Sequence, residues 1–282
     1  MTTRLLHLSD LHFGRPYLPR VGDTIPGLAA ELDPQAIVVS GDFTQRCREA
    51  EFRAAANFLK RLPDVPVLTI PGNHDVPLFY RVLDRVRSPY AFYRKYINEE
   101  LDVVLNLPGV KLVGLNSTKP LRAIKNGRIS RWQLEFSAEA FADASETDWR
   151  IIVAHHHFAP APDYEGSDFM PKAKRAMDEF NRQQVDMILG GHLHRAYVGN
   201  SLDVYAGSPE LERGIIVVQS GTTTSRRGRA REREKNSFNV IDLETTEVRI
   251  SHWLYFDHIQ RFCEVSQHRF PKPSRRALDC DV

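Results

Sequence analysis

Cysteine is scarce in this chain, which has only Cys47, Cys263 and Cys280. An odd number of widely spaced cysteines fits neither a disulfide framework nor a zinc knuckle, and it indicates a reducing compartment. Apolar runs long enough to span a bilayer are also missing, and the N-terminal MTTRLLHLSD becomes polar before a signal sequence could form. We therefore expect a cytoplasmic protein, and these features leave peripheral contact with the inner membrane open.

Excess charge of one sign is missing too, since the formal net charge is +2. This value, with no broad basic face in the sequence, argues against duplex nucleic acid as a partner. The length of 282 residues suits one large α/β domain as well as two average ones. Histidine, by contrast, is present at 11 positions. Most of these histidines lie in or beside short polar segments that follow apolar runs.

One pattern recurs along the chain: a short apolar run ends in a polar cluster. The clusters, each after such a run, are SDLH (9–12), GDFT (41–44), PGNHD (71–75), NST (116–118), HHH (155–157), GHLH (191–194) and SGTTT (220–224). Continuous apolar runs of this kind predict strands buried on both faces. Helix-like segments at 48–62, 130–144 and 172–184 alternate with them, and this alternation predicts an α/β fold.

The C-terminal part of the chain and two insertions depart from this alternation of strands and helices, and they indicate how the domain is organised. GIIVVQS, SFNVIDLE and VRISHWLYF have little helix between them, and we expect an antiparallel group that closes the sheet. Residues 77–100 form an Arg- and Tyr-rich insertion, and residues 160–171 form a loop; both are expected to overhang the site. One domain should span residues 1–257, and residues 258–282 read as a loosely attached C-terminal tail.

Chemistry should gather where the strands end, because ligands of an open α/β sheet bind beyond the carboxyl ends of its strands. These ends carry carboxylate, amide and imidazole groups on Asp10, His12, Asp42, Asn73, His74, the His155–His157 run, His192 and His194. This mixture suits Mn, Fe or Zn better than Ca or Mg. The ligands are too many for one ion and about enough for two, and Asp42 is suited to bridge two ions because SGD places it in a tight turn.

Spacing adds expectations about direction. The alternation in Asp10-x-His12 and His192-x-His194 would let both side chains of each pair project the same way from extended backbone. Asn73 supplies a neutral oxygen. Since adjacent side chains on extended backbone diverge, we expect His74 to point away from the ions and toward the substrate.

The ordered motifs SDLH, GD, GNHD, a His-rich strand end and GHLH resemble those of the calcineurin-like metallophosphoesterases, from Leu5 to about Trp253. The resemblance implies a four-layer αββα sandwich with a dinuclear metal centre, and we expect residues 77–100 to form a helical cap. It also implies the ligand sets, in which one ion is held by Asp10, His12, Asp42 and His194, and the other by Asp42, Asn73, His155 and His192. His156 is the alternative to His155, because the family usually shows HHP where this chain has HHHF. The resemblance places His74 to contact the scissile phosphate or to protonate the leaving group.

These features predict hydrolysis of a phosphodiester or pyrophosphate bond by metal-activated hydroxide. LSDLHFG and GNHD look most like the bacterial cyclic-nucleotide phosphodiesterase branch. The same motifs serve enzymes that cleave UDP-2,3-diacylglucosamine, a lipid A precursor, and the Arg-rich insertion would suit such a nucleotide-lipid. A metal-bound scaffold without turnover is the non-enzyme alternative, and the presence of every expected ligand argues against it. The basic run 226–235 is either a solvated loop or a phosphate- or lipid-recognition segment.

Overall fold

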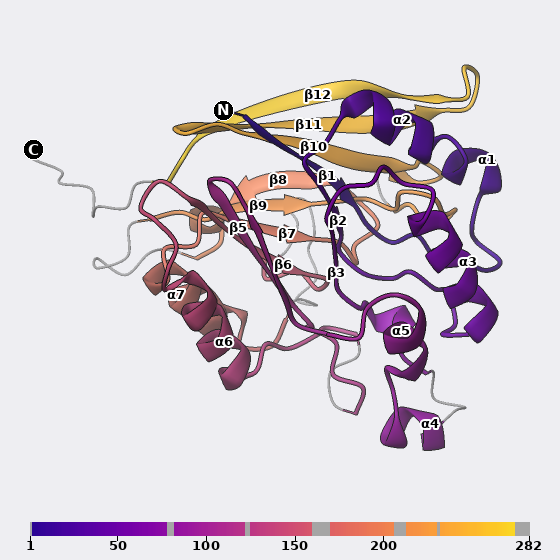
Figure 1. The fold of residues 1–282 in the computed structure, drawn as a ribbon, viewed down its shortest axis with the longest axis horizontal. Coiled ribbons are helices and arrows are strands. Elements are labelled where there is room, and N and C mark those ends of the chain that lie inside the picture. The colour runs from indigo at the N-terminus through magenta and orange to yellow at the C-terminus, as the bar shows by residue number, and fades with distance from the viewer. Residues whose placement is uncertain are drawn as a thin grey trace, which may run out of the picture.

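The computed structural model describes residues 2–77, 82–121, 125–159, 170–205, 213–229 and 232–273. Two mixed sheets of six strands each pack face to face (Figure 1). The first sheet has the order β12-β11-β10-β1-β2-β3, with strands β1 Thr3–Leu8, β2 Ala36–Val39, β3 Val67–Thr69, β10 Ser237–Leu243, β11 Glu247–Phe256 and β12 Arg261–Pro271. The second has the order β4-β5-β6-β7-β9-β8, with strands β4 Val103–Leu107, β5 Val110–Leu115, β6 Trp149–Ala154, β7 Met187–Gly190, β8 Tyr197–Asn200 and β9 Ile216–Gln219.

Helices cover the outer faces of both sheets. Those on the side of the first sheet are α1 Pro19–Gly22, α2 Ile25–Leu32, α3 Glu49–Leu59 and α5 Ala91–Tyr96. Those on the side of the second sheet are α6 Arg131–Phe141 and α7 Ala173–Arg182. The short helix α4 Val82–Arg87 and the 3-10 turns Asn73–Asp75 and Ser201–Asp203 complete the described elements.

The apolar core has three layers because the central strands are buried on both faces. In β1, Leu5 faces the interior between the two sheets, whereas Leu6 and Leu8 pack in the outer cluster with α3. In β5, Leu112 lies between the sheets and Val113 packs toward α6 and α7. This arrangement confirms the predicted four-layer αββα sandwich, and it follows from the period-two alternation of side chains along a strand.

Each sheet contains a group of parallel strands whose carboxyl ends lie along the same edge of that sheet. In the first sheet, β1, β2 and β3 are parallel neighbours. In the second, β5, β6, β7 and β9 form the parallel group. Parallel neighbours end at the same edge of their sheet, so the polar clusters that follow these strands come together there.

Two expectations about the C-terminal third are corrected. The strand in GIIVVQS, β9, runs parallel to β7 in the second sheet, while the antiparallel group β10–β12 extends the first sheet. The loosely attached tail is wrong for residues 261–271, which form β12 and pair with β11. Phe262 of β12 packs against Tyr255 and Phe238. Most of β12 is exposed because it is an edge strand, so it lacks the apolar pattern that marks buried strands.

The insertion after GNHD contains the two short helices α4 and α5, and residues 78–81 lie outside the described ranges. Tyr93 of α5 is fully buried, and its hydroxyl donates to Thr69 Oγ1 at 3.1 Å. Tyr90 Oη donates to the carbonyl of Thr118 at 2.6 Å, so the insertion also contacts the loop that follows β5. No described helix is long and apolar enough to cross a bilayer.

Asp242 ties three strands of the first sheet together. Its carboxylate accepts from Arg4 of β1 at 2.6 Å and from Arg249 of β11 at 3.0 Å. Burial opposes the charge, but the two guanidinium groups hold the pKa of Asp242 below its usual value. The ionised form is therefore more favourable in the folded chain than in the unfolded chain.

We expect Asp242→Asn to lower the free energy of unfolding by about 1–2 kcal/mol near neutral pH, because charge-assisted bonds are lost. A carboxyl whose pKa is depressed on folding stabilises above its ordinary pKa, here 3.8, and this contribution is lost as the pH falls through the folded-state value. The difference between wild type and variant, measured by urea unfolding, should therefore shrink below the ordinary pKa. The exposed Asp64→Asn is the control. A difference that stays constant at acid pH would contradict this role.

Candidate metal centre

The predicted ligands meet where the two sheets present their carboxyl edges. The loops after β1 and β2 are joined by backbone bonds, with Asp10 N donating to Gly41 O at 3.0 Å and His12 N to Asp42 O at 2.9 Å. Gly41 has a φ of +103°, and a Cβ there would lie 2.9 Å from the backbone nitrogen of Gly72. The SGD turn therefore needs glycine, as the sequence indicated, and it brings Asp42 against the GNHD segment.

Unusual backbone conformations mark this site. Five of the predicted ligands have left-handed φ angles, namely Asp10 (53°), His12 (50°), Asp42 (55°), His192 (71°) and His194 (54°). Residues other than glycine seldom adopt this conformation, and those that do cluster at functional sites where the surroundings enforce it. The expected extended backbone of the two x-spaced pairs is thus wrong.

The GNHD segment also departs from the extended conformation expected for it. Asn73–Asp75 is a 3-10 turn. The Asp75 carboxylate, fully buried, accepts from the backbone nitrogens of Gly72, Phe43 and Thr44 at 2.9–3.1 Å. These bonds wind the turn and attach it to the loop after β2. Asp75 belongs to the GNHD motif, but its role in the turn depends on contacts with the loop after β2 that the motif does not reveal.

The first group of ligands consists of Asp10, His12, Asp42 and His194. His12 Nε2 lies 2.9 Å from His194 Nε2, and Asp10 Oδ1 lies 3.0 Å from His194 Nε2. The other ring nitrogens face backbone carbonyls, His12 Nδ1 that of Thr44 at 3.3 Å and His194 Nδ1 that of Arg227 at 3.0 Å. Each Nδ1 can donate to its carbonyl, which leaves both Nε2 atoms and a carboxylate oxygen converging on one point. A metal cation between these three atoms would make the arrangement favourable.

Asp10 and Asp42 each commit one oxygen to the protein and leave the other for a ligand. Asp10 Oδ2 accepts from His192 N at 2.9 Å, and Asp42 Oδ1 accepts from His74 N at 2.8 Å. Asp10 Oδ1 and Asp42 Oδ2 are buried and have no hydrogen-bond donor in the described part of the chain. A buried carboxylate oxygen without a donor is costly, so these two atoms fit a site for positive charge.

The second group is built around the amide oxygen of Asn73. This oxygen lies 2.8 Å from His192 Nδ1 and 3.1 Å from His155 Nε2. Asp42 Oδ2 lies 3.5 Å from His155 Nε2 and 3.6 Å from His12 Nε2 of the first group. The same carboxylate oxygen therefore faces both groups, which is the position that a bridging ligand requires.

His155 and His156 differ in what they face. His155 Nδ1 lies 2.8 Å from the carbonyl of Ser40, which leaves Nε2 directed at Asn73 and Asp42. His156 Nδ1 instead lies 2.8 Å from Ser117 Oγ, and its ring packs beside the ring of His192. His155, His156 and His192 together form the second possible metal-holding group, so both histidines remain candidate ligands, and only His155 also faces Asn73 and Asp42.

The electrostatics of the site agree with a cationic centre. Burial opposes ionisation of Asp10 and Asp42, yet the imidazoles, His194 and His155 foremost, hold the pKa of both carboxyls well below their usual range. Burial lowers the pKa of His12 to about 4, so its ring is neutral and can act as a ligand. Burial also opposes a charge on His155, but Asp42 raises its pKa to about 9, which marks this position as one that favours positive charge.

The ring of His74 lies beside that of His12 in the first group of candidate ligands, and it contacts Arg227 of the basic run 226–235. His74 Nδ1 lies 2.8 Å from the carbonyl of Gln45, so Nε2 accepts from Arg227 Nη1 at 2.9 Å. Arg227 Nη1 also donates to Gln45 Oε1 at 3.0 Å. Both acceptors are neutral, and the half-buried guanidinium keeps its charge next to the two carboxylates.

The sequence of residues 3–196 matches the family model described as calcineurin-like phosphoesterase. Over 170 residues the chain is 28% identical to the 3',5'-cyclic adenosine monophosphate phosphodiesterase CpdA of Escherichia coli K12, covering 56% of each chain. The chain thus spans about half the length of the curated relative it matches.

Two solved structures are similar in fold. A purple acid phosphatase from yellow lupin has a TM-score of 0.68 at 14% identity, over 95% of this chain and 53% of that one. A dimetal phosphatase from Danio rerio has a TM-score of 0.63 at 12% identity, over 96% of this chain and 99% of that one. Together with the family match, they confirm the sandwich fold predicted from the motifs. The chain belongs to the calcineurin-like phosphoesterase family.

Proposed function

We propose that this protein is a dinuclear-metal phosphodiesterase that hydrolyses a small phosphodiester, with cyclic nucleotides as the first substrate class to test. The observation that carries the proposal is the pair of buried, donor-free carboxylate oxygens on Asp10 and Asp42, surrounded by imidazole nitrogens. The similarity to a cyclic AMP phosphodiesterase over part of the chain supports the substrate class.

In this proposal one ion is held by Asp10, His12, Asp42 and His194, and the second by Asp42, Asn73, His155 and His192. Mn, Fe or Zn suits this donor set. Two such ions supply a hydroxide nucleophile at neutral pH and positive charge for the phosphate oxygens. Backbone groups hold these ligands in place. The Nδ1 atoms of His12, His155 and His194 each face a backbone carbonyl. The carboxylates of Asp10 and Asp42 accept hydrogen bonds from the backbone nitrogens of His192 and His74.

His74 and Arg227 are proposed to act on the substrate rather than on the ions. Arg227 has further N–H groups beyond the Nη1 that bonds to His74 and Gln45, and a guanidinium suits a phosphate oxygen. His74 orients that guanidinium. The Nε2 atom of His74 accepts a hydrogen bond from Arg227 Nη1 in this structure. His74 can therefore donate to the leaving oxygen only after this bond is broken and Nε2 is protonated.

The metal-loaded protein should hydrolyse bis-p-nitrophenyl phosphate and cyclic AMP, and Asp42→Ala should abolish both activities with the loss of most bound metal. The reason is that Asp42 serves both ion positions. Elemental analysis and circular dichroism of wild type, Asp42→Ala and the exposed control Asp64→Ala measure this. One ion or none in wild type supplied with Mn would refute the dinuclear centre. Two bound ions without turnover of any phosphodiester in a panel that includes UDP-2,3-diacylglucosamine would indicate a scaffold.

His74→Asn should lower kcat by roughly 10²–10⁴ while both ions remain bound, if His74 assists the leaving oxygen. The loss should be smaller for p-nitrophenyl esters than for cyclic AMP, because p-nitrophenolate departs without protonation. Steady-state kinetics with both substrates and metal analysis test this. Loss of metal would make His74 a ligand, and wild-type turnover of cyclic AMP would make it a bystander.

Arg227→Gln should raise KM for phosphodiesters about tenfold, because a charge-assisted contact to the phosphate is lost. Arg226→Gln and Arg229→Gln are matched controls, since both side chains are exposed on the same loop. Of the four arginines expected to contact an anionic substrate or lipid surface, Arg226, Arg227, Arg229 and Arg231, we propose Arg227 for the phosphate because it alone contacts His74 among the described ones; Arg231 lies outside the described residues. Equal kinetics for all three variants would support the solvated-loop interpretation instead.

A further inference from the structure

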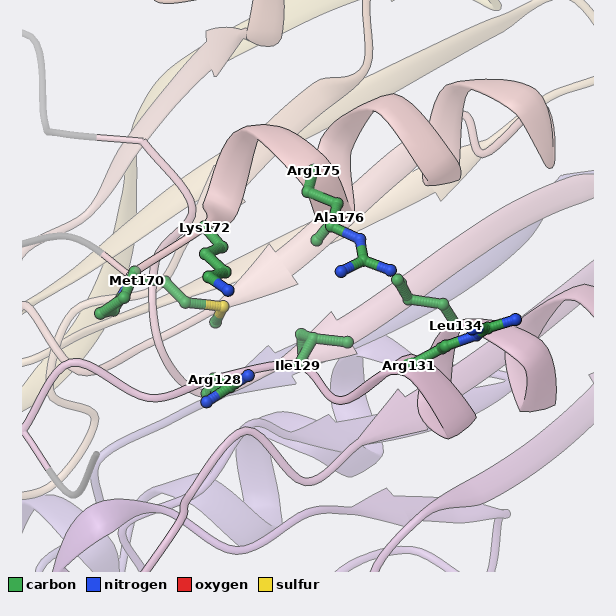
Figure 2. Close-up of a pocket in the computed structure, with 9 residues that line it drawn as sticks. Arg128, Ile129, Arg131, Leu134, Met170, Lys172, Arg175 and Ala176 are labelled. Atoms are coloured by element: carbon green, nitrogen blue, oxygen red, sulfur yellow. The ribbon is translucent and has the colours of Figure 1, made fainter. Parts of the chain in front are cut away.

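A small basic pocket lies between the first turns of α6 and α7, on the side of the second sheet. Figure 2 shows Lys172, which precedes α7, and Arg175 of α7 directed toward the facing segment that carries Arg128 and Ile129. The pocket has a volume of about 80 Å³. A single water needs roughly 10–15 Å³ of such space, so a larger group fits.

The charges around this pocket are unbalanced. Arg131 forms an ion pair with Glu135 at 2.9 Å. Arg128, Lys172 and Arg175 form no ion pair within the described residues, and no acidic side chain lines the pocket there. The first turns of α6 and α7 contain no acidic residue either. Three cations that face one hollow repel one another, and a bound anion would remove this repulsion.

The segments around the pocket are hydrogen-bonded to residues that neighbour the second group of candidate ligands. The backbone nitrogen of Arg128 donates to Ser117 O at 2.8 Å, and Ser117 Oγ lies 2.8 Å from His156 Nδ1. Gly127 has a φ of +69°, and a Cβ on it would lie 2.4 Å from the His156 ring. On the other side, the nitrogen of Met170 donates to the carbonyl of His157 at 3.3 Å. The segments that carry Arg128 and Met170, which line the pocket, are therefore both attached to the His155–His157 run.

A second hollow adjoins the pocket and has a different character. Arg128 and Arg131 line both, and the second hollow, of about 460 Å³, also contacts Lys119, Pro120 and Leu121. Together they offer a cationic pocket and an adjoining larger hollow that Pro120 and Leu121 line along with Lys119, Arg128 and Arg131. This combination matches a ligand with an anionic group attached to a larger organic part.

We propose that Arg128, Lys172 and Arg175 form a subsite for a second phosphate group of the substrate, distinct from the phosphodiester that is cleaved. This inference rests on the proposed phosphodiesterase function and defines its substrate class further, as a phosphodiester that carries another phosphate. Binding of the second phosphate in the subsite lowers the KM for such substrates.

Binding of inorganic phosphate tests the subsite without relying on catalysis. In the zinc-loaded protein, backbone amides of residues 128–131 and 172–175 should shift saturably in ¹H–¹⁵N spectra as phosphate is added. The double variant Arg128→Gln/Arg175→Gln should weaken this binding about tenfold, and high salt should weaken it in wild type by screening. Lys174→Gln is the matched control, because Lys174 is exposed on α7 and pairs with Asp178. Equal shifts with chloride, or unchanged binding in the double variant, would refute the subsite.

Kinetics decide whether the phosphate belongs to the substrate. Three probes are compared. The first is the p-nitrophenyl ester of thymidine 5'-phosphate, and the second is the same ester with a phosphate on its 3'-oxygen. The third carries one further nucleotide, with the additional phosphate on the 3'-oxygen of that nucleotide. We expect a KM about tenfold lower for at least one of the longer probes, and loss of that advantage in Arg128→Gln/Arg175→Gln but not in Lys174→Gln. Phosphate binding without this advantage would show a site for free phosphate and refute the inference. No turnover of any probe would instead refute the proposed phosphodiesterase.

Discussion

Buried negative charge is the constraint on which the rest of the centre depends. Asp10 and Asp42 are fully buried, and each has one oxygen without a donor in the described part of the chain. Such a group is stable only beside positive charge. The orientation of the surrounding rings follows, because each imidazole that turns a lone pair toward these oxygens gives its other nitrogen to a carbonyl, as His12 and His194 do.

The two-sheet scaffold makes this arrangement possible. Left-handed turns at Asp10 and Asp42 cost free energy, and they persist because strands buried on both faces fix the chain on either side. The buried carboxylate of Asp75 locks the GNHD turn to the loop after β2 through amide donors. The ligands are thus held by rigid strand ends, whereas the residues proposed to contact substrate lie farther out.

Basic side chains lie on two sides of the candidate metal centre. Arg227 contacts His74 beside the first group of candidate ligands, and the basic pocket around Arg128 is formed by segments attached to the His155–His157 run. Arg227, Arg128, Lys172 and Arg175 form no ion pair with a carboxylate within the described residues. A substrate with phosphate at its reacting centre and further negative charge elsewhere would match both groups of basic side chains.

Much of the site could be predicted because its residues follow apolar strands, and the carboxyl ends of parallel strands converge wherever a doubly covered sheet forms. Asp10, Asp42, Asn73 and His192 are therefore determined by local sequence. The left-handed turns could not be predicted, since motif spacing carries no information about φ. The contact between Arg227 and His74, which are 153 residues apart, depends on the tertiary structure. The pairing of the exposed edge strand β12 with β11 depends on it as well. Contacts between distant segments depend on the order and packing of the two sheets, which no single stretch of sequence encodes.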